Sequence, residues 1–336
     1  MELKNKSILI TGGTGSFGRA FVAKLLHSNT KIKKLIVFSR DELKQDQMRN
    51  EFPESKYKVL RYFLGDVRDY QRLLRALDGV DIVIHAAALK QVPAAEYNPI
   101  EFIKTNVLGA QNIIEAAIEK KVKRVVTLSS DKACAPINLY GATKLCSDKL
   151  FVAANNYSGK YGNFSVVRYG NVMGSRGSII PKFMDQSKKG VLSVTDPRMT
   201  RFNLTLSDSV KMVMFAIKNT QGSEILVPKI PSYKILDLAK SIGPTCKIKV
   251  IGIRPGEKIH EEMISDSDSN TTFDIGDYYI ILPTLNKHII KRYKKFKIKK
   301  VFQNFRYNSG ENKKFLNLKE IRHLITTNIS KSFKPI

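Results

Sequence analysis

The chain has 336 residues, 43% of them hydrophobic, and a formal net charge of +27; this size suits one large domain or a nucleotide-binding domain with a smaller lobe. Its longest apolar run, residues 82–89, is too short to span a bilayer, and residues 1–7 lack the apolar core of a secretory signal. We therefore expect no membrane insertion. Three cysteines cannot all pair internally, so we also expect no disulfide framework, and we predict a cytoplasmic protein.

Up to about residue 170, strand-like apolar runs alternate with amphipathic helical stretches. This alternation predicts an α/β protein with a Rossmann-type doubly wound parallel sheet. We expect a nucleotide-binding domain over residues 1–170 and mainly a substrate-binding lobe with a basic tail over 171–336, with room for later segments to return to the first domain. The predicted strands are 7–11, 34–39, 57–66, 80–87, 124–130 and 164–170, and the predicted helices are 18–28, 40–51, 70–77, 99–119 and 140–156.

A glycine-rich segment, ITGGTGSFG, joins the first predicted strand to the first predicted helix. Its glycines stand three residues apart and lie where a dinucleotide pyrophosphate would meet the helix N-terminus. The spacing TGxxGxxG resembles the short-chain dehydrogenase/reductase superfamily. The segment therefore predicts a nucleotide cofactor bound by Thr11, Gly12, Gly15, Ser16, Phe17 and Gly18.

The end of the second predicted strand favours NADP over NAD. NAD enzymes usually place an acid there to hold the ribose 2′-hydroxyl, but this strand ends in Ser39 and Arg40. A guanidinium suits the dianionic 2′-phosphate of NADP, and Lys44 could join it. Asp41 competes with this interpretation, because it could serve as the acid that NAD requires.

Two later strand ends complete the predicted cofactor site. The superfamily resemblance implies that Asp66 and Val67, after the third strand, contact the adenine. Ala86 and Ala87 follow the fourth strand and are expected to face the cofactor.

The motif YGATK places Tyr140 and Lys144 four residues apart, on one face of a predicted helix. We expect the lysine ammonium to lower the pKa of the tyrosine, so that the phenolate can act as a base near neutral pH. Lys144 can also hold the nicotinamide ribose. Ser130, at the end of the fifth strand, fits the superfamily's hydroxyl partner of this tyrosine.

Asp131 and Lys132 follow Ser130 directly in the segment SSDK. A simple alcohol dehydrogenase or epimerase needs no additional acid and base at this place. An enzyme that eliminates water needs both, because an acid must protonate the departing hydroxyl and a base must remove a C–H proton. These two residues therefore favour a dehydratase.

The segment resembles the sugar-nucleotide 4,6-dehydratases of the extended short-chain family, whose usual pair is Asp-Glu. Lysine in second place is similar to the inverting UDP-N-acetylglucosamine 4,6-dehydratases of pseudaminic acid biosynthesis, and matching motifs run from about residue 6 to 264. The resemblance implies a homo-oligomer that oxidises C4, eliminates water, returns the hydride to C6 and inverts C5, giving UDP-2-acetamido-2,6-dideoxy-β-L-arabino-hexos-4-ulose. It assigns acid and base to Asp131 and Lys132, the latter kept neutral by burial and by Lys144.

The same resemblance suggests substrate contacts in the second half of the chain. Asn171, Arg201 and Arg254 lie in motifs similar to the family's diphosphate contacts, with Glu257 beside the last of them, and Lys90 follows the fourth strand. Asn203 departs from the tryptophan that the family usually has. His85 is expected to pack within its strand, and HEEMI lacks the second histidine of a zinc motif, so we predict no metal.

The C-terminal tail carries much of the positive charge. Residues 286–336 hold 15 Lys or Arg and two Glu, a net +13. Basic and aromatic residues alternate over 291–307, a mixture found in nucleic-acid and membrane-surface segments. Because lysine predominates, a solvated surface explains the tail more simply, and we expect no specific nucleic-acid partner.

Two alternatives stay open. The nearest is a UDP-N-acetylglucosamine epimerase or a C5-epimerizing dehydratase of capsule or O-antigen synthesis, although some of the latter lack a tyrosine where Tyr140 stands. From another class, a non-catalytic NADP-binding protein could use the basic tail on nucleic acid. The intact set of Tyr140, Lys144, Asp131 and Lys132 argues against lost catalysis.

Overall fold

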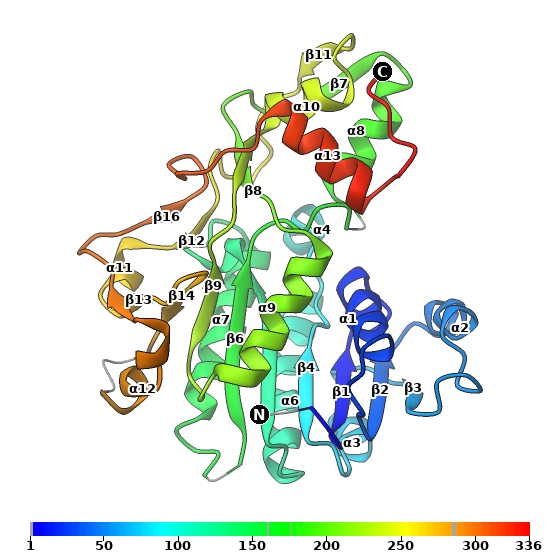
Figure 1. Ribbon diagram of the computed structural model, residues 1–336, viewed down its shortest axis with the longest axis vertical. Coiled ribbons are helices and arrows are strands. Elements are labelled where there is room, and N and C mark those ends of the chain that lie inside the picture. The colour runs from blue at the N-terminus through cyan, green and yellow to red at the C-terminus, as the bar shows by residue number, and fades with distance from the viewer. Residues whose placement is uncertain (1–2, 160, 176, 284–286) are drawn as a thin grey trace.

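The computed structural model describes residues 3–159, 161–175, 177–283 and 287–336. Within them, ten strands form one large sheet (Figure 1). Seven neighbouring strands, from β3 to β9, are parallel, and the last three are antiparallel. In spatial order the strands are β3 (Leu60–Leu64), β2 (Lys34–Ser39), β1 (Ser7–Thr11), β4 (Ile82–His85), β5 (Arg124–Ser130), β6 (Asn163–Tyr169), β9 (Ile225–Pro228), β14 (Tyr278–Ile281), β13 (Thr272–Asp274) and β15 (Lys299–Lys300).

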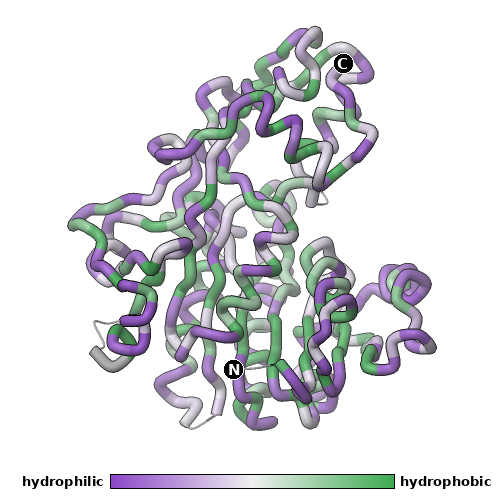
Figure 2. Tube along the Cα trace, in the orientation of Figure 1, coloured by the Kyte–Doolittle hydropathy of each residue, from purple (hydrophilic) through white to green (hydrophobic). Residues whose placement is uncertain are grey.

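Helices cover both faces of this sheet (Figure 1). Because side chains alternate along a strand, Ile8 and Ile10 of β1 pack with one helical layer and Leu9 packs with the other. Figure 2 shows the resulting concentration of hydrophobic residues along the strands. The first layer contains α1 (Ser16–Leu26) and α9 (Leu206–Asn219), and the second contains α3 (Tyr70–Ala76), α6 (Gly109–Glu119) and α7 (Leu139–Ala154).

The predicted fold class is therefore confirmed, and the predicted strands and helices of the first 170 residues are present. Short helices follow the carboxyl ends of the strands, where ligands bind in such sheets. They are α2 (Glu42–Glu51), α4 (Val92–Tyr97), α5 (Pro99–Phe102), the π-helix η1 (Ile103–Leu108) and the 3-10 helix η2 (Asp131–Ala133).

A smaller lobe lies beyond the carboxyl ends of the strands (Figure 1). It has its own apolar core, which includes Phe183, Leu192 and Ile321. Its last helix begins after a capping box formed by Asn317 and Glu320. The lobe contains α8 (Ile179–Ser187), β7 (Val191–Val194), β8 (Thr200–Phe202), β10 (Ser232–Lys234), α10 (Ile235–Ile242), β11 (Lys247–Val250) and α13 (Leu318–Asn328).

Residues 265–312, which showed no clear pattern, return to the large sheet. Phe273 of β13 and Ile280 of β14 are buried there, and β14 pairs with β9. No helix in the described ranges is long and apolar enough to cross a membrane. The remaining elements are β12 (Glu262–Ile264), α11 (Asp266–Ser269), α12 (Lys287–Arg292), η3 (Lys294–Phe296) and β16 (Tyr307–Asn308), which pairs with β12.

Candidate functional site

The glycine loop lies tightly against the end of β4. Gly12 has φ +63°, and a Cβ on it would lie 2.9 Å from the Cα of Ala87. A Cβ on Gly18 would lie 2.3 Å from the carbonyl oxygen of Gly13. Neither position has room for a side chain, so both must be glycine. The backbone between β1 and α1 is therefore not covered by side chains at these two positions, and a ligand can approach it closely.

Thr11, predicted as a cofactor contact, has its side chain directed elsewhere. Its hydroxyl accepts hydrogen bonds from the amides of Ala86 and Ala87, at 3.1 and 3.2 Å, and lies 2.9 Å from Nδ1 of His85. Thr11 is fully buried. Its hydroxyl therefore joins the ends of β1 and β4 and positions the loop; it does not face the ligand. His85 packs within its strand, as predicted.

The ends of β2 and β3 place a basic group beside the glycine loop. Nη1 of Arg40 lies 3.6 Å from Oδ2 of Asp66, and half of the Arg40 side chain is exposed. The Ser39 hydroxyl lies 2.9 Å from that of Thr14. Thr14 was missed by sequence reasoning; its position inside the glycine segment is the signal that could have found it. The exposed Arg40 side chain is accessible to a nucleotide, whereas the Asp66 carboxylate also accepts from Nη2 of Arg68 at 2.8 Å.

Asp41, the competing acid, caps α2. Its carboxylate accepts from the backbone amide of Lys44 at 2.9 Å and forms an ion pair with the Lys44 ammonium. Asp41 therefore already has two partners, and Lys44 joins the carboxylate rather than Arg40. That Lys44 joins Arg40 at a 2′-phosphate stays a prediction.

Ser130, Asp131 and Lys132 gather at the carboxyl end of β5. The Ser130 hydroxyl donates to Oδ1 of Asp131 at 2.7 Å and accepts from the backbone amide of Lys132 at 3.2 Å. Nζ of Lys132 lies 3.1 Å from the same Oδ1. Asp131 is buried, and its Oδ2 has no hydrogen-bond partner among the described residues. One carboxylate oxygen is thus held by Ser130 and Lys132, and the other can still accept a hydrogen bond.

Tyr140 and Lys144 lie on one face of α7, as predicted, but their proton chemistry differs from the prediction. Burial raises the pKa of Tyr140, while the Lys132 charge and the hydrogen bond with Ser130 oppose this rise. Burial lowers the pKa of Lys144, and its ammonium donates to the Leu128 carbonyl at 2.8 Å. The cation that favours the Tyr140 phenolate is therefore Lys132, since its positive charge is the one that lowers the pKa of the tyrosine.

Two further residues complete the surroundings of Lys132. Oε1 of Glu261 lies 3.4 Å from Nζ of Lys132 and 3.6 Å from Nε of Arg201. Burial lowers the pKa of Lys132, but Asp131 and Glu261 outweigh burial and the pKa is raised. The prediction that burial and Lys144 keep Lys132 neutral is therefore wrong for the free chain, since two carboxylates hold it as an ammonium ion.

Glu261 was missed by sequence reasoning, which considered HEEMI only as an incomplete zinc motif. No local pattern marks it, because its partners come from residues 132 and 201. Arg201, predicted as a diphosphate contact, also donates to the carbonyl oxygens of Thr200 and Ile259, at 2.7 and 3.0 Å.

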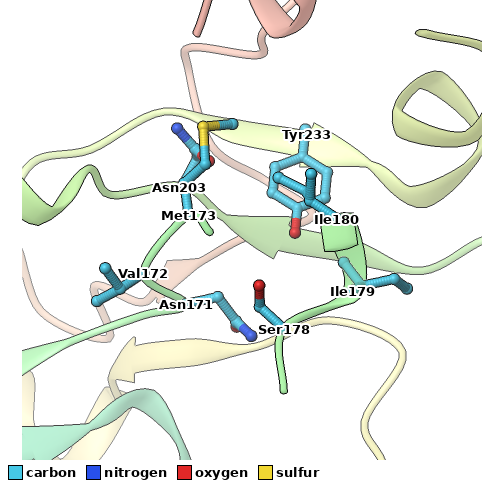
Figure 3. Close-up of a pocket in the computed structure, with 8 residues that line it drawn as sticks. All are labelled: Asn171, Val172, Met173, Ser178, Ile179, Ile180, Asn203 and Tyr233. Atoms are coloured by element: carbon cyan, nitrogen blue, oxygen red, sulfur yellow. The ribbon is translucent and has the colours of Figure 1, made fainter. Parts of the chain in front are cut away.

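A narrow pocket between the sheet and the smaller lobe contains Asn171. Oδ1 of Asn171 and the hydroxyl of Ser178 are buried, and neither has a hydrogen-bond partner in the part of the chain that the structure describes. Figure 3 shows the Ser178 hydroxyl and the hydroxyl end of Tyr233 directed toward the same space, with the Asn171 amide beside Ser178. Asn203, which stands where the family usually has tryptophan, is a further lining residue and lies beside Met173. The pocket can accept a polar ligand group.

The other predicted substrate residues lie at the margin. Partial burial and the Lys132 charge lower the pKa of Lys90, so Lys90 borders the same site. Arg254 and Glu257 form an exposed pair 3.8 Å apart. Their loop is held at the start of α7, where Nδ2 of Asn138 donates to the Gly256 carbonyl at 2.7 Å. The structure thus keeps Arg254 and Glu257 outside the buried cluster.

A second buried ion pair lies behind α7. Nη2 of Arg168 is 3.3 Å from Oδ2 of Asp148, and both side chains are at most 2% exposed. Asp148 also accepts from the Ser129 hydroxyl at 2.8 Å. Among the described residues, no group of three or more His, Cys, Asp or Glu side chains could hold a metal ion.

Comparisons with known proteins agree over most of the chain. The family described as "Polysaccharide biosynthesis protein" matches residues 8–283. An inverting UDP-N-acetylglucosamine 4,6-dehydratase of Campylobacter jejuni is 51% identical over 330 residues, covering 95% of this chain and 97% of that one. A UDP-glucose 4-epimerase of Rickettsia typhi is 45% identical, with 96% of each chain covered. The solved structure of Pen from Bacillus thuringiensis is 38% identical, with a TM-score of 0.87 over 97% of this chain and 99% of that one.

Proposed function

The chain belongs to the Polysaccharide biosynthesis protein family, and from this premise we propose that it is a UDP-N-acetylglucosamine 4,6-dehydratase, a hydro-lyase, that inverts C5. The observation that carries the proposal is the cluster of Ser130, Asp131, Lys132 and Tyr140 at the carboxyl edge of the sheet. It occurs in a chain 51% identical to an inverting dehydratase. The family resemblance predicted from the sequence is thereby confirmed.

We propose NADP as the cofactor. The close backbone approach at Gly12 fits a pyrophosphate, and the half-exposed Arg40 fits a 2′-phosphate. Asp41, which would favour NAD, caps α2 and pairs with Lys44. Bound NADP supplies a hydride acceptor for C4 and a hydride donor for C6. Tyr140 and Lys144 would lie beside its nicotinamide ribose.

The side chains carry the proton steps. Tyr140 takes the proton of the 4-hydroxyl as C4 is oxidised, and the 4-ketone then acidifies the C5–H bond. Lys132 removes the C5 proton while Asp131 protonates the departing 6-hydroxyl, which leaves as water. Asn171 and Arg201 are proposed to hold the diphosphate, with Lys90 at the sugar and Arg254 and Glu257 on the loop beyond.

These roles require Lys132 to be neutral and Asp131 to be protonated. The free chain holds the reverse arrangement, but the two differ by one proton moved from Nζ of Lys132 to Oδ1 of Asp131, across 3.1 Å. The transfer changes no net charge, which is favourable in a site shielded from water. After elimination, Lys132 carries the C5 proton and Asp131 is again a carboxylate. As C6 receives the hydride, C5 takes one solvent-derived proton on the face opposite to Lys132, which gives the inverted product, and Tyr140 returns one proton to solvent.

The test is turnover of UDP-N-acetylglucosamine by the purified protein in D₂O, with no added cofactor, followed by NMR. We expect water loss, a methyl group at C6, deuterium at C5 and the L-arabino 4-keto product. The first product being the D-xylo sugar, before slow exchange at C5, contradicts inversion.

A second candidate, a 4-epimerase, is favoured by the 45% identity with the rickettsial relative. An epimerase returns the hydride to C4 and leaves the 6-hydroxyl in place. The same NMR experiment would then show a C4 epimer without deuterium at C5. Asp131 and Lys132 favour elimination, since epimerisation needs neither.

We further propose a cytoplasmic homo-oligomer that acts in the pseudaminic acid pathway and has no specific nucleic-acid partner. Cys134, Cys146 and Cys246 are all free, which suits a reducing compartment. Exposed Tyr97, Ile100 and Leu108 offer an apolar surface for another copy of the chain.

A further inference from the structure

Glu261 enters the site from the C-terminal part of the chain. It precedes β12 and is 3% exposed. Its backbone is fixed on both sides by Ser309, since the Glu261 amide donates to the Ser309 hydroxyl at 2.9 Å and the Ser309 amide donates to the Glu261 carbonyl at 2.8 Å. Ser309 follows β16, which belongs to the basic tail. The tail thus holds a buried carboxylate at a fixed position.

The side chain of Glu261 faces cations on two sides. Its Oε1 lies 3.4 Å from Nζ of Lys132 and 3.6 Å from Nε of Arg201. Its Oε2 is buried and has no hydrogen-bond partner within residues 3–159, 161–175, 177–283 and 287–336. An ionised carboxylate at this depth is stable only beside cations, so its contacts with Lys132 and Arg201 are what keep it there.

We propose that Glu261 is a positioning residue for Lys132: it holds the lysine ammonium between two carboxylates and sets the proton affinity of the amine. Only its consequence for turnover rests on the proposed function. Asp131 contacts the amine from η2 at 3.1 Å, and Glu261 contacts it at 3.4 Å from the residue before β12. The two contacts together hold Lys132 where Asp131 is within reach for proton transfer.

Several other groups act on Lys132, and the experiment must separate them from Glu261. Asp131 and Tyr140 favour the ammonium form, whereas Arg201 opposes it. Lys90 is a second cation whose charge interacts with that of Lys132. Tyr233 of β10 lies near the same charged side chains, which also act on its pKa. All of them remain in place when Glu261 alone is changed.

The variant Glu261→Gln removes the charge and keeps the shape. Trace labelling with acetic anhydride over a pH series, followed by peptide mass spectrometry, reports the neutral fraction of Lys132, whose side chain is 23% exposed. An opposite charge this close raises a lysine pKa by about one to three units. We therefore expect Lys132 to be labelled at least about tenfold faster at pH 8 in the variant.

Glu262→Gln is the matched control. Glu262 is the next residue and is equally buried, but its carboxylate pairs with Arg306 at 2.7 Å and not with Lys132. Labelling of Lys132 in this variant should equal that of the unmodified protein. Equal labelling in all three proteins, or an equal rise in both variants, would overturn the proposal, because the first shows no coupling and the second shows general loosening.

Glu261→Asp keeps the test decisive if the glutamine variant does not fold. The carboxylate is then one methylene farther from Lys132, so labelling should rise in the same direction by a smaller factor; no rise in a folded variant rejects the proposal. Labelling needs no substrate, so it stands even if UDP-N-acetylglucosamine is not turned over. Where it is turned over, the alkaline limit of activity should move to lower pH in Glu261→Gln only.

Discussion

The surroundings of the two lysines of the site shift the lysine pKa in opposite directions. On the α7 side, Lys144 is 3% exposed, and burial outweighs Asp148 and lowers its pKa. On the β12 side, Lys132 is held by Asp131 and Glu261, and its pKa is raised although burial opposes this. The comparison teaches that the number of adjacent carboxylates, rather than depth alone, decides whether a buried lysine keeps its proton.

The two sides also differ in origin. The α7 side is built from β5, β6 and α7, which are close together in the sequence. The β12 side joins residues 131–132, 201, 261 and 309, which only the fold brings together. Each prediction below tests one side against the other.

The largest effect is expected from Tyr140→Phe, because Tyr140 lies between the two sides. Loss of the phenol removes a proton acceptor that acts in the chemical step, so kcat should fall by about 10²–10⁴-fold. Binding of UDP-N-acetylglucosamine, measured by calorimetry, should be nearly unchanged. Normal product formation by this variant would remove Tyr140 from the catalytic role.

Asp148→Asn tests the α7 side through stability. The change leaves Arg168 with Asp268, 3.4 Å away, as its carboxylate partner, so losing the charge-assisted contact should lower the free energy of unfolding by about 1.5–3 kcal/mol. Urea unfolding measures the change. The matched control is Asp185→Asn, whose exposed partner Lys188 is 3.4 Å away, where we expect a change within about 0.5 kcal/mol. Equal effects of the two substitutions would show that the buried pair contributes nothing special.

The sequence predicted most of the α7 side and, on the β12 side, Asp131, Lys132 and Arg201, but not Glu261 and Ser309, which hold them in place. Strands β1 to β6, the glycine loop and the pair Tyr140 and Lys144 follow from local periodicity and spacing, which the structure preserves. Asp131 and Lys132 were found because they are adjacent to Ser130. Glu261 could not be found in this way, since its only signal is contact with residues 60 to 130 positions away.

The short strands of residues 265–312 were missed for a related reason. A strand of two to four residues shows no measurable alternation, and β13, β14 and β15 are stabilised by pairing with β9 and with one another. The proton states were missed too. They depend on which carboxylates face each lysine, and this is set by tertiary packing.

Arg40→Ala is expected to have a smaller effect, confined to the cofactor. One charge-assisted contact contributes about 1.5–3 kcal/mol, and because the Arg40 side chain is half exposed, we expect the lower end, a loss of about tenfold in NADP affinity. NAD affinity, measured by the same fluorescence titration, should hardly change. Arg49→Ala, in which the lost arginine pairs with Glu54 on the outer surface, should leave both affinities unchanged. Equal losses for NADP and NAD would remove Arg40 from the 2′-phosphate.

Near neutral pH the smallest effect is expected from His85 of β4, which tests whether buried positions beside Lys144 exclude positive charge in general. Burial, and then the Lys144 charge, lower the pKa of His85 from 6.5 to about 3. Between these values the unfolded chain binds a proton that the folded chain excludes, so stability is complete above pH 6.5 and falls as the pH decreases toward 3. The loss should be about 1.4 kcal/mol per pH unit. Urea unfolding at pH 7, 6 and 5 measures the total slope, and His85→Gln removes this residue's share. If the slope is the same in both proteins, His85 is protonated in the folded state, and buried positions beside Lys144 do not exclude positive charge.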